Sequence, residues 1–311
     1  MSLHRLRSIT IGVPAVDPVR SFYRDFGLTE TSAGRFETAD GGEQLQIAPS
    51  PRRTLLGLTV GADDADDLDR AAAALARLGI ETSRGAGSLR AVEPVTAVQV
   101  ELIVEPRVAQ KPPLRLPLNV PGEALRVDAR SPAVLAAVSK PRRLSHVVVA
   151  SSDAPASKRF FLEGLGFRVS DEVPAIGASF LRCSTDHHNL LVQPGPFPFL
   201  HHTAWEMDDV DAVGRAAAAM LAADATRHVW GLGRHGIGSN YFWYLRDPAG
   251  NFAEYTSDLD VIADADAWQV AASTGAHPLA AWGPPVPGAF LAPPDIVALA
   301  QAQGERGRSS K

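Results

Sequence analysis

The chain has 311 residues, of which 45% are hydrophobic and 21% charged, and its formal net charge is -5 with a pI near 6.0. This composition is ordinary for a folded globular protein and argues against a disordered chain. The sequence contains no sustained basic stripe, so we expect no nucleic-acid partner.

At this length we expect two domains, each large enough to bury its own core. The N-terminal MSLHRLRSITIGV lacks the apolar core and cleavage site of a secretory signal. The alanine-rich stretch at 216–223 is too short to span a bilayer. The lone Cys183 excludes an internal disulfide and suits a reducing compartment. We therefore expect a cytoplasmic protein with no membrane partner.

An internal repeat is visible from the first residues onward. RLRSITIGVPAVDPVRSFYRDFGL, from Arg5, and RLSHVVVASSDAPASKRFFLEGLGF, from Arg143, share an apolar strand, a turn with Asp and Pro, and a helix with an aromatic pair. The pairs are Phe22-Tyr23 and Phe160-Phe161, and each helix ends at a Gly, as a helix stop should.

A second match follows each of these segments. LLGLTVGADDADDLDRAAAAL, from Leu55, and FLHHTAWEMDDVDAVGRAAAAM, from Phe199, each predict a strand, an Asp-rich helix start and an alanine-rich helix. Each half closes with a short strand pattern, VQVELIV or NFAEYTS. The repeats predict one unit, a strand, a helix and a few strands, used four times.

The repeats also divide the chain. We expect an N-terminal domain over 1–105, a Pro- and Arg-rich linker over 106–142 with a short helix within SPAVLAAVSK, and a C-terminal domain over 143–262. A Pro-rich extension fills 263–311, and we expect its last few residues to be disordered. Its WGPPVP segment is open to two interpretations, a cover for an active-site mouth or a packing tail.

Alignment of the halves locates the chemistry in the second one. His146 falls opposite Ser8 and His202 opposite Gly57, whereas Glu254 keeps a counterpart in Glu101. Packing alone would not require two imidazoles in one copy only; a metal held by the C-terminal half would.

His146, His202 and Glu254 lie in three short strand patterns, LSHVVVA, LHHTAWEM and NFAEYTS. Two imidazoles and one carboxylate on one side of a cation leave other coordination positions open, which suits non-heme iron(II) that binds substrate and dioxygen together. Taken singly, a strand histidine is more often structural. Because side chains alternate along a strand, His201 and His202 should face opposite ways. We place His202 inward and His201 behind the ligands or at the surface.

The C-terminal half resembles the type I extradiol ring-cleaving dioxygenases of the vicinal oxygen chelate superfamily. The matching segments are LSHVVV, HHNLLV, LHHTAWEM and GRHGIGSNYFWYLRDPAGNFAEYT. The resemblance implies an α+β fold of two tandem domains, each made of paired βαβββ modules that form a concave mixed sheet. It also implies Fe(II), with Mn(II) as the alternative, a catecholic substrate cleaved by dioxygen to a muconic semialdehyde-type product, and a homo-oligomer.

The resemblance further assigns three catalytic residues. His188 matches the acid-base histidine, a role typically worth about 10²–10⁴-fold, with His187 as its competitor. His235 and Tyr244 match groups that hydrogen-bond the substrate oxygens. Asn189 departs from the family pattern, because many relatives carry an acidic residue there.

Other interpretations stay open at this point. Tyr244, Trp205, Trp230 and Trp243 fit a core as well as a pocket, His235 fits a turn cap, and Arg234 fits a surface charge or a substrate contact. A glyoxalase-like isomerase of the same superfamily is one alternative function, although such enzymes usually draw ligands from both halves. A metal-free drug-binding protein, like those of bleomycin resistance, is another.

Overall fold

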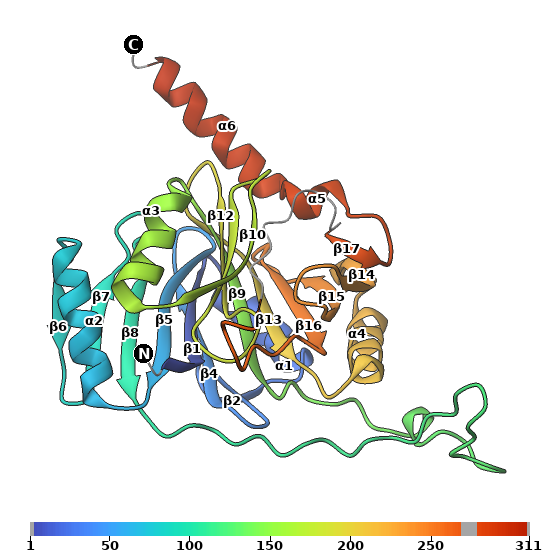
Figure 1. The fold of residues 1–311 in the computed structure, drawn as a ribbon. Coiled ribbons are helices and arrows are strands. Elements are labelled where there is room, and N and C mark those ends of the chain that lie inside the picture. Colours follow the sequence, from blue (N-terminus) through green and yellow to red (C-terminus); the bar gives the residue numbers. More distant parts are fainter. Residues whose placement is uncertain (1–2, 269–278, 310–311) are drawn as a thin grey trace.

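Two mixed β-sheets, one from each half of the chain, form the body of the molecule (Figure 1). The computed structural model describes residues 3–268 and 279–309. The first sheet has eight strands and the second has nine. The predicted α+β class with two tandem sheets is therefore confirmed.

The N-terminal sheet contains two modules of a strand, a helix and three strands. Their elements are β1 (Leu3–Val13), α1 (Val16–Asp25), β2 (Thr29–Ser32), β3 (Arg35–Thr38), β4 (Gly42–Pro49), β5 (Thr54–Ala62), α2 (Ala65–Arg77), β6 (Thr82–Arg84), β7 (Ser88–Val92) and β8 (Gln99–Val104). The strand order is β2-β3-β4-β1-β5-β8-β7-β6. The two modules meet where β1 pairs antiparallel with β5.

The C-terminal sheet repeats this plan. Its elements are β9 (Arg143–Ser151), α3 (Ala154–Arg159), the π-helical turn η2 (Phe160–Leu165), β10 (Arg168–Val173), β11 (Ala178–Arg182), β12 (Leu190–Pro194), β13 (Phe199–Glu206), α4 (Val210–Ala223), η3 (Ala225–Arg227), β14 (His228–His235), β15 (Tyr241–Arg246), β16 (Phe252–Ser257) and β17 (Ala280–Trp282). The order is β10-β11-β12-β9-β13-β16-β15-β14-β17. The module predicted from the repeats is used four times.

Local sequence signals set the ends of the helices. Asp64 caps α2 by accepting a hydrogen bond from the Asp67 amide, and Asp209 caps α4 in the same way through the Ala212 amide. After η2, Gly166 adopts a left-handed conformation (φ 75°) that a side chain would disfavour. The Asp-rich starts and the glycine stops therefore act as the sequence predicts.

Helix α1 of the first half packs against the back of the second sheet. The rings of Phe26 and Tyr255 stack with centroids 3.9 Å apart, and the Tyr255 hydroxyl donates to the Phe26 carbonyl at 2.8 Å. Tyr23 meets Trp205 edge to face at 6.2 Å. Because Trp205 and Tyr255 alternate with Ala204 and Glu254 along their strands, this contact supports the face opposite those two residues.

The segments outside the sheets differ in structure. Between β8 and β9 the chain is extended, and its single helical turn is the 3₁₀ turn η1 (Pro132–Val134), shorter than the helix we expected there. Two helices end the chain, α5 (Gly288–Leu291) and α6 (Pro294–Ser309). Helix α6 reaches Ser309 and 310–311 lie outside the described residues, so the disorder expected of the last few residues stays a prediction.

No helix within 3–268 or 279–309 combines the length and the apolar character that a membrane span needs.

Candidate metal centre

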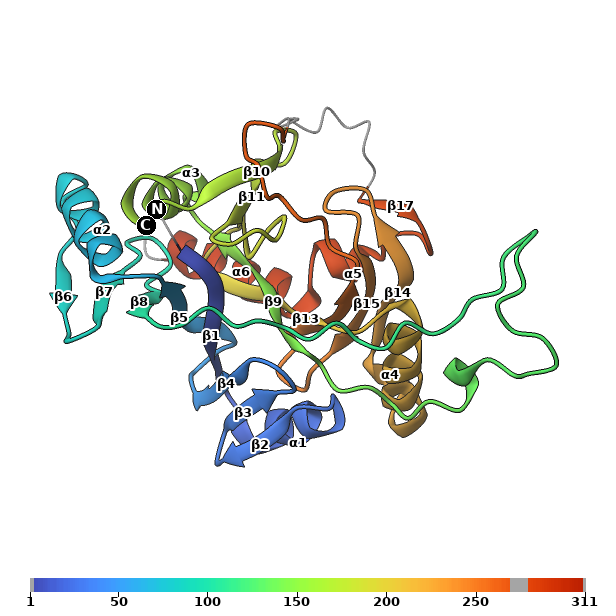
Figure 2. The same ribbon diagram turned by 60° about the horizontal axis from the view of Figure 1, so that its bottom comes forward.

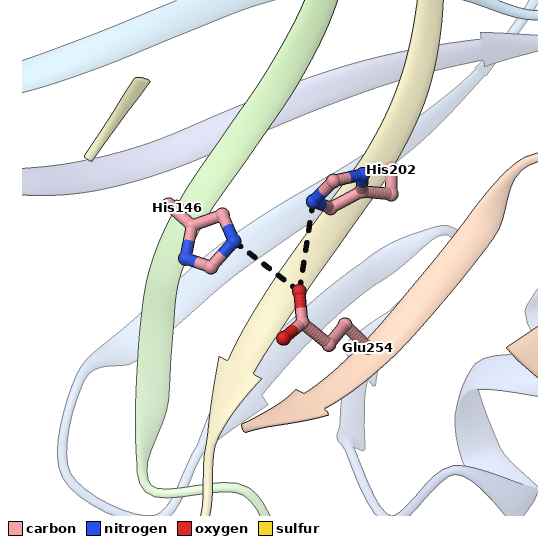
Figure 3. Close-up of side chains that lie close together, drawn as sticks. All are labelled: His146, His202 and Glu254. Atoms are coloured by element: carbon pink, nitrogen blue, oxygen red, sulfur yellow. Dashed lines mark ion pairs between the residues drawn. The ribbon is translucent and has the colours of Figure 1, made fainter. Parts of the chain in front are cut away.

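Three side chains on adjacent central strands of the second sheet converge on one point (Figure 3). His146 lies on β9, His202 on β13 and Glu254 on β16. Glu254 Oε2 lies 3.2 Å from His146 Nε2 and 3.5 Å from His202 Nε2. One ligand atom from each residue lies within 4.8 Å of the others, so a single ion can contact all three.

The strand register explains this convergence. Ala204 pairs with His146 on one neighbouring strand and with Glu254 on the other. Ala204 carries only a methyl group, and it is fully buried between the two ligands. A small residue at this position leaves space above the sheet between the imidazoles and the carboxylate.

The donor set fits a divalent cation. Asn240 Nδ2 donates to Glu254 Oε1 at 3.1 Å. Among the described residues, however, nothing donates a hydrogen bond to Glu254 Oε2, although the side chain is completely buried. A buried carboxylate oxygen is costly unless a donor or a cation compensates it. Two imidazole nitrogens that point at this oxygen form a site for borderline metals such as iron or manganese.

His201 holds His202 in the form that a metal needs. His201 Nε2 donates to the Phe290 carbonyl at 2.8 Å, so its Nδ1 accepts from His202 Nδ1 at 2.8 Å. His202 Nε2 is then free of hydrogen and faces Glu254. Burial lowers the pKa of His201 to about 4, which keeps its ring neutral.

The prediction that His201 and His202 face opposite ways is wrong. The register of β13 against β9 shifts between Leu200 and His202, which makes His201 an extra residue in the strand. Such a bulge breaks the alternation of side chains. Both histidines are buried and line the same cavity, so His201 is not a surface residue.

His188 lies beside the ligands, just before β12. Its ring centroid is 4.2 Å from that of His146, and the side chain lines the cavity. His188 Nδ1 is 3.0 Å from His187 Nδ1. Burial first, and then the nearby His146, hold the pKa of His188 well below its ordinary value, so its imidazole is neutral. His187, the competing candidate, is not among the cavity residues.

Tyr244 and His235 form a hydrogen-bonded pair on the other side of Glu254. Tyr244 on β15 pairs with Glu254 in register, and its hydroxyl is 2.9 Å from His235 Nε2. His235 Nδ1 donates to the Leu279 carbonyl at 2.7 Å, so Nε2 accepts from the tyrosine. Burial raises the pKa of Tyr244 well above its ordinary value, and it lowers the pKa of His235. Both groups are therefore neutral near pH 7.

A cavity of about 470 Å³ opens beside these side chains. Apart from the histidines, Tyr244 and Gln193, its described walls are apolar and come from Val148, Val173, Ile176, Ala178, Phe180, Leu191, Pro194, Ile237, Leu279, Phe290 and Leu291. The C-terminal extension supplies the last three. The WGPPVP segment, 282–287, is not among the described residues that line the cavity, and both interpretations of that segment stay open.

Other residues considered in the sequence are not among the described residues that line the cavity. Arg234 pairs with Asp258 at 2.7 Å. Trp230 is a core residue that stacks on Tyr244, with ring centroids 5.7 Å apart. Asn189 accepts from the Cys183 amide at 2.9 Å and donates to Asp186 Oδ2 at 3.2 Å. The asparagine therefore anchors the β11–β12 connection and leaves the imidazole to other partners.

Four contributors to the site were missed in the sequence, namely Asp171, Asn240, Leu279 and Phe290. Asp171 and Asn240 contact His187 and Glu254, while Leu279 and Phe290 accept hydrogen bonds from the cavity histidines. The carbonyl groups of the last two carry no sequence signal. Asn240 lies within the family-like segment GRHGIGSNYFWYLRDPAGNFAEYT, and this position was the one available clue.

Residues 143–255 match the family model of the glyoxalase/bleomycin resistance protein/dioxygenase superfamily. The match spans all three metal-ligand candidates and the whole of β9 to β16 apart from the last two residues of β16. The family resemblance found in the sequence is therefore confirmed.

Two curated proteins are similar to the chain in sequence. Metapyrocatechase 2 of Cupriavidus necator is 36% identical over 197 residues, which are 62% of this chain and 59% of that protein. An iron-dependent extradiol dioxygenase of Rhodococcus jostii (strain RHA1) is 30% identical over 158 residues, 45% of this chain and 50% of that protein. The chain thus matches only half to three-fifths of the length of these relatives.

Two solved structures share the fold over most of the chain. A Mn(II)-bound glyoxalase from Novosphingobium aromaticivorans is 28% identical, covers 87% of both chains and has a TM-score of 0.68. A halotolerant catechol dioxygenase is 18% identical, covers 94% of this chain and 96% of that one, and has a TM-score of 0.73. Both halves of the chain, and not only residues 143–255, therefore share the fold of these two structures.

Proposed function

We propose that the chain is a metal-dependent extradiol dioxygenase that cleaves a catechol with dioxygen to a muconic semialdehyde-type product. The observation that carries this proposal is the buried set of two imidazoles and one carboxylate beside an apolar cavity that also contains a neutral His188. A metal held by His146, His202 and Glu254 supplies Lewis acidity and open coordination positions for a diol and dioxygen. The similarity to two relatives named for catechol or extradiol chemistry supports this choice.

His188 is the residue that transfers the proton in this proposal. His188 has a bare Nε2 in the cavity when its Nδ1 carries the hydrogen, so it accepts a proton from a substrate hydroxyl. The same proton returns to the oxygen that carries negative charge when the ring opens. Histidine suits this two-way role because small changes in its surroundings move its pKa across the neutral range.

Tyr244 and His235 orient and stabilise the other substrate oxygen. The Tyr244 hydroxyl stays protonated, because burial raises its pKa, and so it remains a donor throughout. Without substrate, that hydroxyl donates its one hydrogen to His235 Nε2 at 2.9 Å. When substrate binds, the O–H turns from His235 to the substrate oxygen, where a hydrogen-bond donor stabilises developing negative charge.

The cavity walls favour a catechol with an apolar ring substituent. None of the described residues that line it is Arg, Lys, Asp or Glu. Burial of a phenyl-sized group contributes about 1.5–3 kcal/mol. We expect kcat/KM for an aryl- or alkyl-catechol to exceed that for a carboxylated catechol by about 10–100-fold.

We propose Fe(II) as the natural metal, with Mn(II) as the alternative. Two histidines and one carboxylate suit both ions. One relative is named iron-dependent and one similar structure contains Mn(II), so similarity favours neither. The metal that gives the higher turnover after anaerobic reconstitution identifies the natural one.

We also propose that the chain forms a homo-oligomer. Residues 112–139 extend away from the body as a long loop (Figure 2). Eight of the eighteen exposed large apolar side chains among the described residues lie in this loop: Leu114, Leu118, Val120, Leu125, Val127, Val134, Leu135 and Val138. Mass measurement in solution tests this, and a monomer at micromolar concentration would rule it out.

A glyoxalase-like isomerase is the second candidate, because the similar Mn(II)-bound structure bears that name. It is less well supported, since Ser8 and Gly57 leave the N-terminal half without imidazole ligands. A drug-binding protein without a metal would have no use for the convergent ligands.

One experiment separates the three functions. The anaerobic protein is loaded with Fe(II) or Mn(II), mixed with a panel of catechols, and exposed to ¹⁸O₂ while oxygen uptake and the yellow product are recorded. We expect one O₂ consumed per catechol and both labelled atoms in the product. His202→Ala should abolish bound metal and turnover, while His188→Ala should keep the metal and lose about 10²–10⁴-fold in rate. Isomerisation of a hemithioacetal without oxygen uptake would instead support the glyoxalase, and a chain that binds no metal would support the binding protein.

A further inference from the structure

A second histidine and a carboxylate stand behind His188. His187 is completely buried, its Nδ1 lies 3.0 Å from His188 Nδ1, and its Nε2 lies 2.9 Å from Asp171 Oδ2. The indole of Trp268 packs on His187 with ring centroids 5.4 Å apart. Asp171, His187 and His188 form an unbroken row of hydrogen-bonded side chains, which leads from β10 to the cavity.

The row determines which nitrogen of His188 carries hydrogen. A carboxylate only accepts, so His187 Nε2 is the donor to Asp171. If Nε2 carries the one ring hydrogen of His187, its Nδ1 offers a lone pair, and the hydrogen between the two rings belongs to His188 Nδ1. His188 Nε2 is left bare on the cavity side.

We propose that Asp171 and His187 are positioning residues that fix the tautomer and orientation of His188 and balance the positive charge it gains with a proton. This inference rests on the proposed function of His188 as the acid-base residue. Asp171 does not touch the substrate and acts only through His187.

The metal ligand His202 provides an internal comparison. It is also paired through Nδ1 with the preceding histidine, His201, but that pair ends at the neutral Phe290 carbonyl. A carbonyl fixes a tautomer and cannot balance an added positive charge. A metal ligand needs only a fixed tautomer, whereas a group that takes up and returns a proton also needs a charge that balances the proton. The row behind His202 ends at a neutral carbonyl, and the row behind His188 ends at the Asp171 carboxylate.

The test compares Asp171→Asn and Asp171→Glu with Glu172→Gln as a matched control. Glu172 is the next residue, and its partners Lys158 and Ser179 lie away from the row. We expect Asp171→Asn to lower kcat about 10–100-fold, part of the 10²–10⁴-fold typical of acid-base catalysis, with KM and bound metal within twofold of wild type. Asp171→Glu should recover most of kcat, and Glu172→Gln should not change it. A purely structural role would lower bound metal or raise KM instead.

A readout without turnover keeps the inference separate from the proposed function. In metal-free protein labelled with ¹⁵N-histidine, the ring shifts should show hydrogen on Nδ1 of His188, and Asp171→Asn should mix the two tautomers. Hydrogen on Nε2 of His188 in the wild type, or unchanged kcat in Asp171→Asn, would overturn the inference. If no catechol is cleaved but Nδ1 carries the hydrogen, the proposed reaction fails and the positioning row stands.

Discussion

Replacement of Glu254 by Gln should change stability in opposite directions with and without metal. In the metal-free protein, the buried Oε2 atom has no hydrogen-bond donor among the described residues. An unsatisfied buried acceptor costs about 1–3 kcal/mol, and more when charged. At pH 8, where histidine side chains are ordinarily neutral, Glu254→Gln should therefore be more stable than wild type by about 1–3 kcal/mol.

With metal present the order should reverse. An ion at about 1,000 times its dissociation constant stabilises a folded protein by about 4 kcal/mol. At about 2 °C per kcal/mol for a chain of this size, Mn(II) should raise the wild-type melting temperature by about 8 °C. Glu254→Gln lacks the charged ligand and should lose most of this shift.

The assay is anaerobic thermal unfolding of chelator-treated protein with and without Mn(II). Glu101→Gln is a matched control, because Glu101 occupies the corresponding position of the first sheet and pairs with Arg90 at 2.9 Å. The control should keep the full metal shift. A metal-free Glu254→Gln protein less stable than wild type, or one that keeps the Mn(II) shift, would refute the reasoning.

Three further changes test the site and its surroundings. Ala204→Val places two more methyl groups between His146 and Glu254, so bound metal measured by elemental analysis should fall at least tenfold, since overpacking a close-packed site forces side chains apart. Phe290→Ala removes an apolar wall of the cavity and should lower kcat/KM for an aryl-catechol about 10–100-fold, with a smaller loss for unsubstituted catechol. Burial raises the pKa of Asp247 from 3.8 to about 6, so the folded state holds its proton more tightly than the unfolded state and ionisation costs stability as the pH rises through this interval. Asp247→Asn should therefore gain stability relative to wild type between pH 4 and 7, by on the order of 3 kcal/mol at most, in chemical unfolding measured across that range.

The sequence predicted that His146, His202 and Glu254 lie close together, and this could be predicted because the two halves have the same register. Gly57 pairs with Gln99 in the first sheet as His202 pairs with Phe252 in the second. Ser8 likewise pairs with Thr59, two residues beyond Gly57. Counting along aligned strands therefore placed the three candidate ligands on neighbouring strands, where the structure brings them together.

What the sequence could not predict depends on contacts between distant segments and on one irregularity. The bulge at His201 cancels the alternation on which its outward placement was based. Asp171 reaches His187 because the β10–β11 hairpin folds back, and no spacing rule predicts that contact. Phe290 arrives from the C-terminal extension, 88 residues after His202, and its carbonyl has no residue-specific signal.

Glu101 and Glu254 occupy corresponding positions of the two sheets, and their surroundings show why the candidate metal site lies in the second half. The Glu101 side chain is 27% exposed and pairs with the Arg90 guanidinium. Such an exposed pair contributes about 0–1 kcal/mol to stability, and the arginine already balances the charge of the carboxylate. Glu254 occupies the same position in the second sheet, is completely buried, and faces two imidazoles without a hydrogen-bond donor to Oε2 among the described residues. Aromatic side chains of the first half pack behind its strand and exclude water from that side. A carboxylate kept there is a net cost to the fold unless a cation supplies the missing charge, so the local energetics and the ligand geometry lead independently to the same ion.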